Sequence, residues 1–214
     1  MQGACRLGPS VIVRGIRVKA GLVRWLLVAC IVQPVAARAE WQPIEEVRTY
    51  AVTGSSGAAL YDSIGQNGPD LGGSRAVAHT TFKLTWTRKY ERRGNACVIA
   101  VARPKLIITY TLPKPAGKLP AATAASWATF IAGIETHERV HGDYIEQMVR
   151  DIEAMSLGFS ADNDPDCRKI RIELTKRLGE LSARQRQQGR DFDKAEMSEG
   201  GNIRRLVLQL VNGP

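Results

Sequence analysis

The chain has 214 residues, which is enough for one domain with a hydrophobic core and too few for two domains of ordinary size. Its apolar fraction of 44% and charged fraction of 24% are those of an ordinary globular protein. The formal net charge of +9 suggests a nucleic-acid partner, but residues 1–39 alone carry six basic and no acidic side chains. The remaining residues carry 24 basic and 21 acidic side chains, so we expect no nucleic-acid partner.

The N-terminal segment has the pattern of an export signal. Basic side chains at 14–24 precede an apolar run at 25–35, and Ala37-Arg38-Ala39 supplies the small residues that signal peptidase requires. We expect cleavage before Glu40, so that residues 1–39 form a signal peptide. The mature protein is then periplasmic or secreted.

Two other interpretations of this leader stay open. The leader could remain as an uncleaved membrane anchor, although its apolar run is short for a bilayer span. Alternatively, Leu27-Val28-Ala29-Cys30 resembles the motif at which a lipoprotein is acylated. In each case, membrane contact is expected only through the leader.

Four cysteines are present, and two of them, Cys5 and Cys30, lie in the predicted leader. The mature chain keeps Cys97 and Cys167, and an even pair in an oxidising compartment predicts a disulfide. Closing a loop of that length stabilises a fold by roughly 4–5 kcal/mol on the chain-entropy model. Without export, two buried thiols would be expected instead.

The first half of the mature chain is predicted to be rich in β-structure. The expected elements are a strand at 47–52, a short helix at 58–64, a loop rich in glycine and proline at 67–74, and strands at 80–90, 96–102 and 106–112. In the strand at 80–90, Phe82, Leu84 and Trp86 alternate with polar residues, which indicates one buried and one solvated face.

The second half is predicted to be helical. Apolar residues recur at helical spacing from Trp127 to Ile152. The turn at 162–165 offers N-cap residues for a second helix, whose apolar stripe runs from Ile170 to Leu181 and which can extend to 200–201. A short apolar segment at 203–211 follows. The expected fold is α+β, with a small antiparallel sheet followed by two long helices in one domain, residues 40–214.

The segment His137-Glu138-Arg139-Val140-His141 is an HExxH motif on the first long helix. Residues four apart lie on one helical face, which is the spacing that two imidazole ligands of one zinc ion require. Glu138 lies beside that face and could act as general base for a zinc-bound water. The alternative is a solvated histidine pair that binds no metal and has no catalytic role. The motif predicts a zinc site of the zincin type, with Glu138 as catalytic residue.

A catalytic zinc ion takes a third protein ligand and keeps one open position. We expect Glu196 as this ligand, because it continues the apolar face of the second helix, where an acid needs a partner. Asp193 and Glu199 on the same segment are alternatives, as is His79 before the strand at 80–90. A frayed, solvated helix end would explain these acids without a metal.

The mature chain resembles a family of bacterial predicted secreted Zn-dependent proteases. The resemblance rests on the order of weak motifs around HExxH, namely 50–54, 60–64, Gly68-Pro69, 81–86, Cys97, 110–113, Trp127, Phe130 and Cys167. Many members of that family carry a Tyr-Asp segment followed by Thr and His-Gly. Here the corresponding residues are Phe192-Asp193, Glu196 and Glu199-Gly200, so a ligand role of that histidine would pass to a carboxylate.

The expected function is that of an exported zinc metallopeptidase acting on a peptide or protein substrate in the cell envelope. Hydrolysis of cell-wall peptides would use the same chemistry. The alternative is a non-enzymatic envelope protein in which the helix pair forms a structural metal site or a protein-binding module. A closed site with four protein ligands would favour that alternative.

Overall fold

Residues 41–213 are described by the computed structural model, and they belong to the second of the two units into which the chain divides, 1–39 and 40–214. The predicted signal peptide, its cleavage site, Cys5 and Cys30 lie outside the described residues. The elements in chain order are β1 (Ile44–Val52), α1 (Gly57–Asn67), β2 (His79–Arg93), β3 (Ala96–Pro115), α2 (Ala121–Ser156), β4 (Ser160–Ala161), α3 (Lys169–Met197) and α4 (Asn202–Val211). The α+β class is therefore confirmed.

The sheet is mixed, so the expectation of an antiparallel sheet was wrong. Its strand order is β1-β3-β2, and β4 pairs with one end of β3. β2 and β3 form an antiparallel hairpin around a tight turn at Gly94, whereas β1 runs parallel to β3. Because α1 and a long loop separate β1 from β2, β1 is free to take the far edge of β3 instead of forming a hairpin.

The strands predicted at 96–102 and 106–112 are one continuous strand, β3, which runs through Pro104. Proline lacks the N–H that a central strand needs. At this point, however, β3 has only β2 as a neighbour, because the pairing with β1 begins at Ile107 and the pairing with β4 ends at Val98. On the side of β3 that faces away from β2, no strand lies next to Pro104, so the missing N–H leaves no neighbouring strand without a hydrogen bond there.

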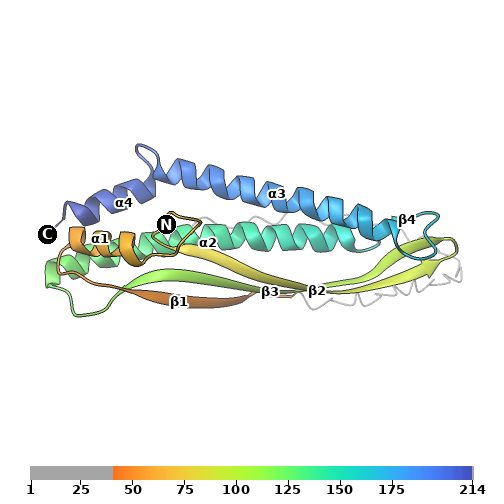
Figure 1. Cartoon of the computed structure of the whole chain (residues 1–214), viewed down its shortest axis with the longest axis horizontal. Helices are drawn as coiled ribbons and strands as arrows, with labels where there is room; N and C mark the ends of the chain where they lie inside the picture. Colours follow the sequence, from red (N-terminus) through yellow and green to blue (C-terminus); the bar gives the residue numbers. More distant parts are fainter. Residues whose placement is uncertain (1–40, 214) are drawn as a thin grey trace, which may run out of the picture. The chain divides into compact units, whose positions relative to one another are not determined.

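Helix α2 lies along the sheet, and α3 packs on the side of α2 that faces away from the strands (Figure 1). The buried stripe of α2 contacts α1 and α4 through Trp127, Phe130 and Ile134, and it contacts the sheet through Ile145 and the residues that follow. Between these two apolar clusters the stripe is polar. The HExxH motif therefore occupies positions that face other elements of the fold.

Helix α3 begins and ends at identifiable signals. The buried carboxylate of Asp164 accepts hydrogen bonds from the backbone N–H groups of Arg168, Lys169 and Ile170. The N-cap position itself is Arg168, so Asp164 satisfies the start of the helix from four residues upstream. The helix ends at Met197, before 200–201, because Gly200 has a positive φ of 79°. The apolar segment at 203–211 then forms a separate helix, α4, packed against α2.

The predicted disulfide is present and joins Cys97 of β3 to Cys167, just before α3. Both cysteines belong to a core cluster with Ile170 and Leu174, so the first turns of α3 are anchored covalently and by apolar packing. Within residues 41–213, none of the helices combines the length and the apolar character needed to cross a bilayer. The disulfide fits an extracellular or periplasmic location.

Candidate metal centre

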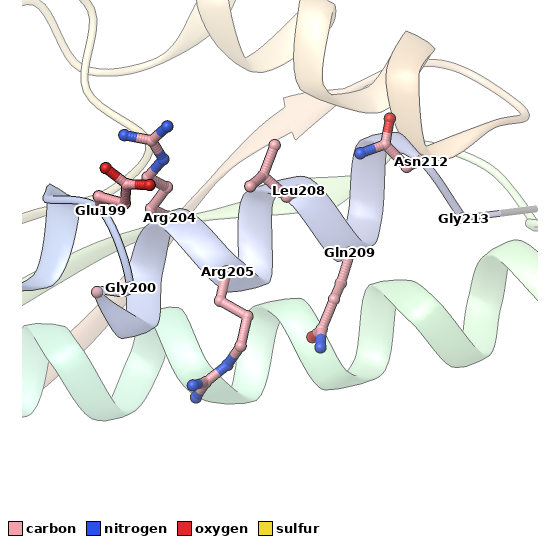
Figure 2. A pocket seen from close by; sticks show the side chains of 9 residues that line it. Glu199, Gly200, Arg204, Arg205, Leu208, Gln209, Asn212 and Gly213 are labelled. Carbon is pink, nitrogen blue, oxygen red and sulfur yellow. The ribbon is translucent and has the colours of Figure 1, made fainter.

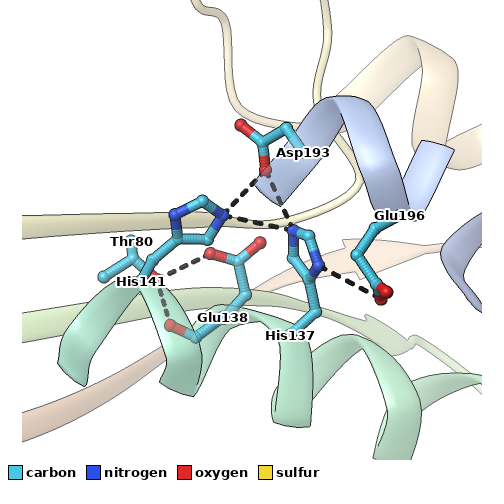
Figure 3. A network of polar contacts seen from close by, with 6 residues as sticks. All are labelled: Thr80, His137, Glu138, His141, Asp193 and Glu196. Carbon is cyan, nitrogen blue, oxygen red and sulfur yellow. Dashed lines mark hydrogen bonds and ion pairs between the residues drawn. The ribbon is translucent and has the colours of Figure 1, made fainter. Parts of the chain in front are cut away.

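Helix α2 brings three polar side chains of the HExxH motif into the protein interior. The side chains of His137 and Glu138 are only 9% and 6% exposed, and that of His141 is 15% exposed. They lie between Ile134 and Ile145 of the buried stripe. The four-residue spacing places the Nε2 atoms of the two histidines 3.2 Å apart, so that both rings direct a nitrogen at the same point (Figure 3).

Asp193 of α3 reaches the same point from the opposite helix. Its Oδ1 atom lies 2.8 Å from Nε2 of His141 and 3.2 Å from Nε2 of His137. The three side chains form a group whose ligand atoms all lie close enough together to hold one metal ion. An imidazole nitrogen without its proton and a carboxylate oxygen are both metal donors.

Two features of α3 allow this close approach. Gly189 is buried against His141, and a Cβ atom at this position would lie 3.4 Å from Nδ1 of the imidazole. One turn later, the ring of Phe192 stacks on His137 with centroids 4.7 Å apart and planes 20° apart. Tyr144 packs edge-on against Phe192. The aromatic cluster covers one side of the imidazole pair.

The other predicted ligands lie outside this group. Glu196 approaches the opposite side of the His137 ring, where its Oε2 atom is 3.8 Å from Nδ1. His79 begins β2, and Glu199 follows the end of α3. The metal-ligand assignment of Glu196 stays a prediction, but the distances favour Asp193, which the sequence offered as an alternative.

Glu138 is held by a residue that the sequence did not single out, Thr80 of β2. The Thr80 hydroxyl lies 2.6 Å from Oε2 of Glu138 and 3.0 Å from its backbone carbonyl oxygen. Within residues 41–213, Thr80 is the hydrogen-bond partner of this carboxylate, and its second oxygen, Oε1, faces the imidazoles in Figure 3. Glu138 therefore combines a fixed oxygen with an unpaired one beside the metal-binding group.

The charges of the site are coupled. Burial by itself would raise the pKa of Asp193, but hydrogen bonds from His137 and His141 outweigh burial and hold this pKa well below its usual range. Burial likewise opposes the charged form of His141, yet the hydrogen bond and negative charge of Asp193 raise its pKa above the ordinary value. The carboxylate is thus ionised at neutral pH, as a metal ligand must be.

Both residues that sequence reasoning missed, Thr80 and Gly189, have a detectable signal in the sequence. Thr80 lies on the same face of β2 as the partly buried Leu84 and Trp86, which makes it a polar residue on the helix-facing side of the strand. Phe82, on the same face, is 42% exposed, so the predicted burial of this residue was wrong. Gly189 is a glycine inside a long helix, a position that is costly unless another group approaches closely.

A separate surface hollow of about 640 Å³ lies around α4 rather than at the metal centre (Figure 2). It is lined by Glu199, Arg204, Arg205 and Leu208, among others. None of the three grouped donors belongs to it.

A family model described as "Bacterial protein of unknown function (DUF922)" matches residues 47–201, which is more than two thirds of the chain and includes every residue of the site. No curated protein and no solved structure shows a significant match to the chain. The predicted resemblance is confirmed at the level of a bacterial family of unknown function, and protease activity stays a prediction. The chain belongs to the DUF922 family.

Proposed function

We propose that this protein is an exported zinc-dependent peptidase whose metal is held by His137, His141 and Asp193 and whose general base is Glu138. The observation that carries this proposal is the convergence of two imidazole nitrogens and one carboxylate oxygen, with a second carboxylate alongside that is not needed for ligation. Two histidines and one acid form the ligand set of several catalytic zinc sites, which keep a fourth position open.

The spacing of the three donor atoms supports zinc. Ligands at about 2.0–2.1 Å around a tetrahedral zinc ion lie roughly 3.3 Å from one another. The three separations here are 2.8, 3.2 and 3.2 Å, so only small side-chain shifts would be needed. The buried Nδ1 atom of His137, which lacks a hydrogen-bond partner within residues 41–213, faces Glu196. If Nε2 binds metal, Nδ1 carries the proton and Glu196 is the natural acceptor, as carboxylates often are around zinc.

When bound, zinc would supply a water of lowered pKa and polarise the carbonyl group of a substrate. Glu138 would accept the proton of the attacking water through Oε1 and deliver it to the amine that leaves. The stacked ring of Phe192 excludes solvent from one side of His137 and keeps the imidazole plane fixed. The substrate class we propose is a peptide or protein of the cell envelope, with cell-wall peptides as one possibility.

The first test is zinc content, measured by elemental mass spectrometry on the chain from Glu40 purified from an oxidising compartment. We expect about one zinc ion per chain in the wild type and in Glu138→Gln, and almost none in His137→Ala. Cleavage of casein and wall peptides should be lost in Glu138→Gln and kept in Glu135→Gln, a surface carboxylate on the same helix. Equal cleavage by both variants would contradict the role of Glu138, and a metal-free wild type would refute the site.

One observation favours a structural metal site as the second candidate function. The buried residues of α3 are Ile170, Leu174 and Gly189, so the second half of this helix has little apolar contact with the rest of the fold. A metal ion that joined α3 to α2 would stabilise this contact. Full zinc occupancy without hydrolysis of either substrate class, together with a large fall in melting temperature on zinc removal, would favour this function.

A further inference from the structure

We infer that Thr80 is a positioning residue for Glu138, which keeps one carboxylate oxygen turned away from the metal-binding group so that the other stays free for water. This inference rests on the proposed function of Glu138 as a base. It adds a residue from β2 to a site otherwise formed by α2 and α3.

The hydrogen-bond chemistry fixes the direction of the contact. An ionised carboxylate and a backbone carbonyl only accept hydrogen bonds, so the Thr80 hydroxyl must be the donor. Its single hydrogen has two acceptors in reach, Oε2 of Glu138 at 2.6 Å and the Glu138 carbonyl at 3.0 Å. The shorter, charge-assisted contact is the stronger of the two.

Thr80 lies on a rigid part of the sheet. Thr80 pairs with Tyr110 in the β2–β3 ladder, and a β-branched side chain has few rotamers in a strand. Glu138, by contrast, has three rotatable side-chain bonds and is nearly buried. Within residues 41–213, its carboxylate has no other hydrogen-bond partner than Thr80. The position of the carboxylate is therefore set by the sheet.

The contact also prevents a competing arrangement. The Glu138 carboxylate lies beside the imidazoles of His137 and His141 in Figure 3, and without the Thr80 hydrogen bond it would be free to turn towards them. It would then occupy the open metal position in place of water. Thr80→Val should therefore impair catalysis without weakening metal binding, an outcome that loss of structure would not produce.

The experiment compares Thr80→Val, which keeps the shape and removes the hydroxyl, with Thr80→Ser, which keeps the hydroxyl. Thr81→Val is the matched control, because this exposed neighbour faces the opposite side of the sheet. In Thr80→Val we expect kcat to fall on the order of 10-fold to 100-fold, since misplacement of a catalytic group by about 1 Å can cost that much. Zinc content should stay at the wild-type level, because the three ligands His137, His141 and Asp193 are unchanged. Thr80→Ser and Thr81→Val should behave as wild type.

Affinity for acetohydroxamate, a zinc-binding probe that requires no turnover, separates this inference from the proposed function. We expect weaker binding in Thr80→Val and no further loss when this change is added to Glu138→Gln. A wild type that binds zinc and the probe but cleaves nothing would refute the peptidase, while the same probe comparison still tests Thr80. The inference is overturned if Thr80→Val keeps wild-type probe affinity, if Thr80→Ser fails equally, or if zinc is lost from Thr80→Val.

Discussion

Asp193→Asn and Glu196→Gln form a matched pair that distinguishes a metal ligand from a neighbouring charge. The two carboxylates lie about one turn apart on α3 and face opposite nitrogens of the same His137 ring. Each substitution removes one negative charge and changes the side-chain volume very little. A histidine binds a metal through one nitrogen, so only the carboxylate on the Nε2 side can share that metal directly.

The structure sets the expected magnitudes. Loss of a carboxylate that supports a ligating histidine typically reduces metal affinity 10-fold to 100-fold. The 3.8 Å contact of Glu196 is longer than a hydrogen bond, so for Glu196→Gln we expect a loss of about 10-fold or less. Asp193→Asn replaces the anionic donor itself, for which we expect roughly 100-fold or more, equivalent to about 2.7 kcal/mol.

Simple electrostatics predicts the reverse order for the two losses of zinc affinity. The side chain of Asp193 is 52% exposed and that of Glu196 is 22% exposed, so solvent screens the charge of Asp193 more strongly. The assay is zinc competition against a chromophoric chelator near neutral pH, with Asp191→Asn as a control for an exposed charge on the same helix. A larger loss in Glu196→Gln than in Asp193→Asn would refute the assignment and restore Glu196 as the ligand.

Three further predictions concern the scaffold. Replacing Cys97 and Cys167 by Ala opens a 70-residue loop, which should lower the free energy of unfolding by about 4–5 kcal/mol. In calorimetry the melting temperature should fall by roughly 10–15 °C. An unchanged melting temperature would contradict the disulfide. Gly142→Ala places a Cβ 2.2 Å from Oη of Tyr110 and should destabilise by about 1–3 kcal/mol in urea unfolding. Adding Tyr110→Phe should recover part of this loss, whereas strictly additive effects would exclude the clash. Burial opposes ionisation of Asp164, but hydrogen bonds from backbone N–H groups outweigh burial and lower its pKa in the folded state. The ionised carboxylate therefore stabilises the fold fully above its ordinary pKa of about 3.9. This stabilisation is lost as the pH falls through the lower pKa of the folded state. The stability difference between wild type and Asp164→Asn should therefore narrow below about pH 4, and parallel pH curves would contradict this cap.

The helices and the strand segments could be predicted because their signals are local. A period of 3.6 along α2 and of 2 along β2 is visible within ten residues of sequence. The parallel pairing of β1 with β3 could not be predicted, because it depends on which edge of β3 is vacant after the β2–β3 hairpin has formed. The same is true of Pro104, whose tolerance in β3 depends on where β1 stops.

In the site, the sequence was informative within one helix and less so between helices. His137, Glu138 and His141 follow from helical spacing alone. The third donor was sought by extending the stripe of Ile170–Leu181 over fifteen residues, and small departures from 3.6 residues per turn accumulate over that length. Counting from Gly189 instead places Asp193 one turn away on the face that contacts α2.

The weak anchoring of the second half of α3 couples metal binding to helix docking. The disulfide and Ile170 hold the first turns, whereas the turns around Asp193 contact α2 mainly through the site itself. A ligand that binds only the docked state stabilises it by mass action, by about 2.7 kcal/mol at one hundred times its Kd. Zinc should therefore slow amide hydrogen exchange more in residues 182–197 than in 169–181, because only the former depend on the metal contact. Equal protection of both halves by zinc would show instead that α3 docks as a single unit, and that Asp193 is already in place when the metal arrives.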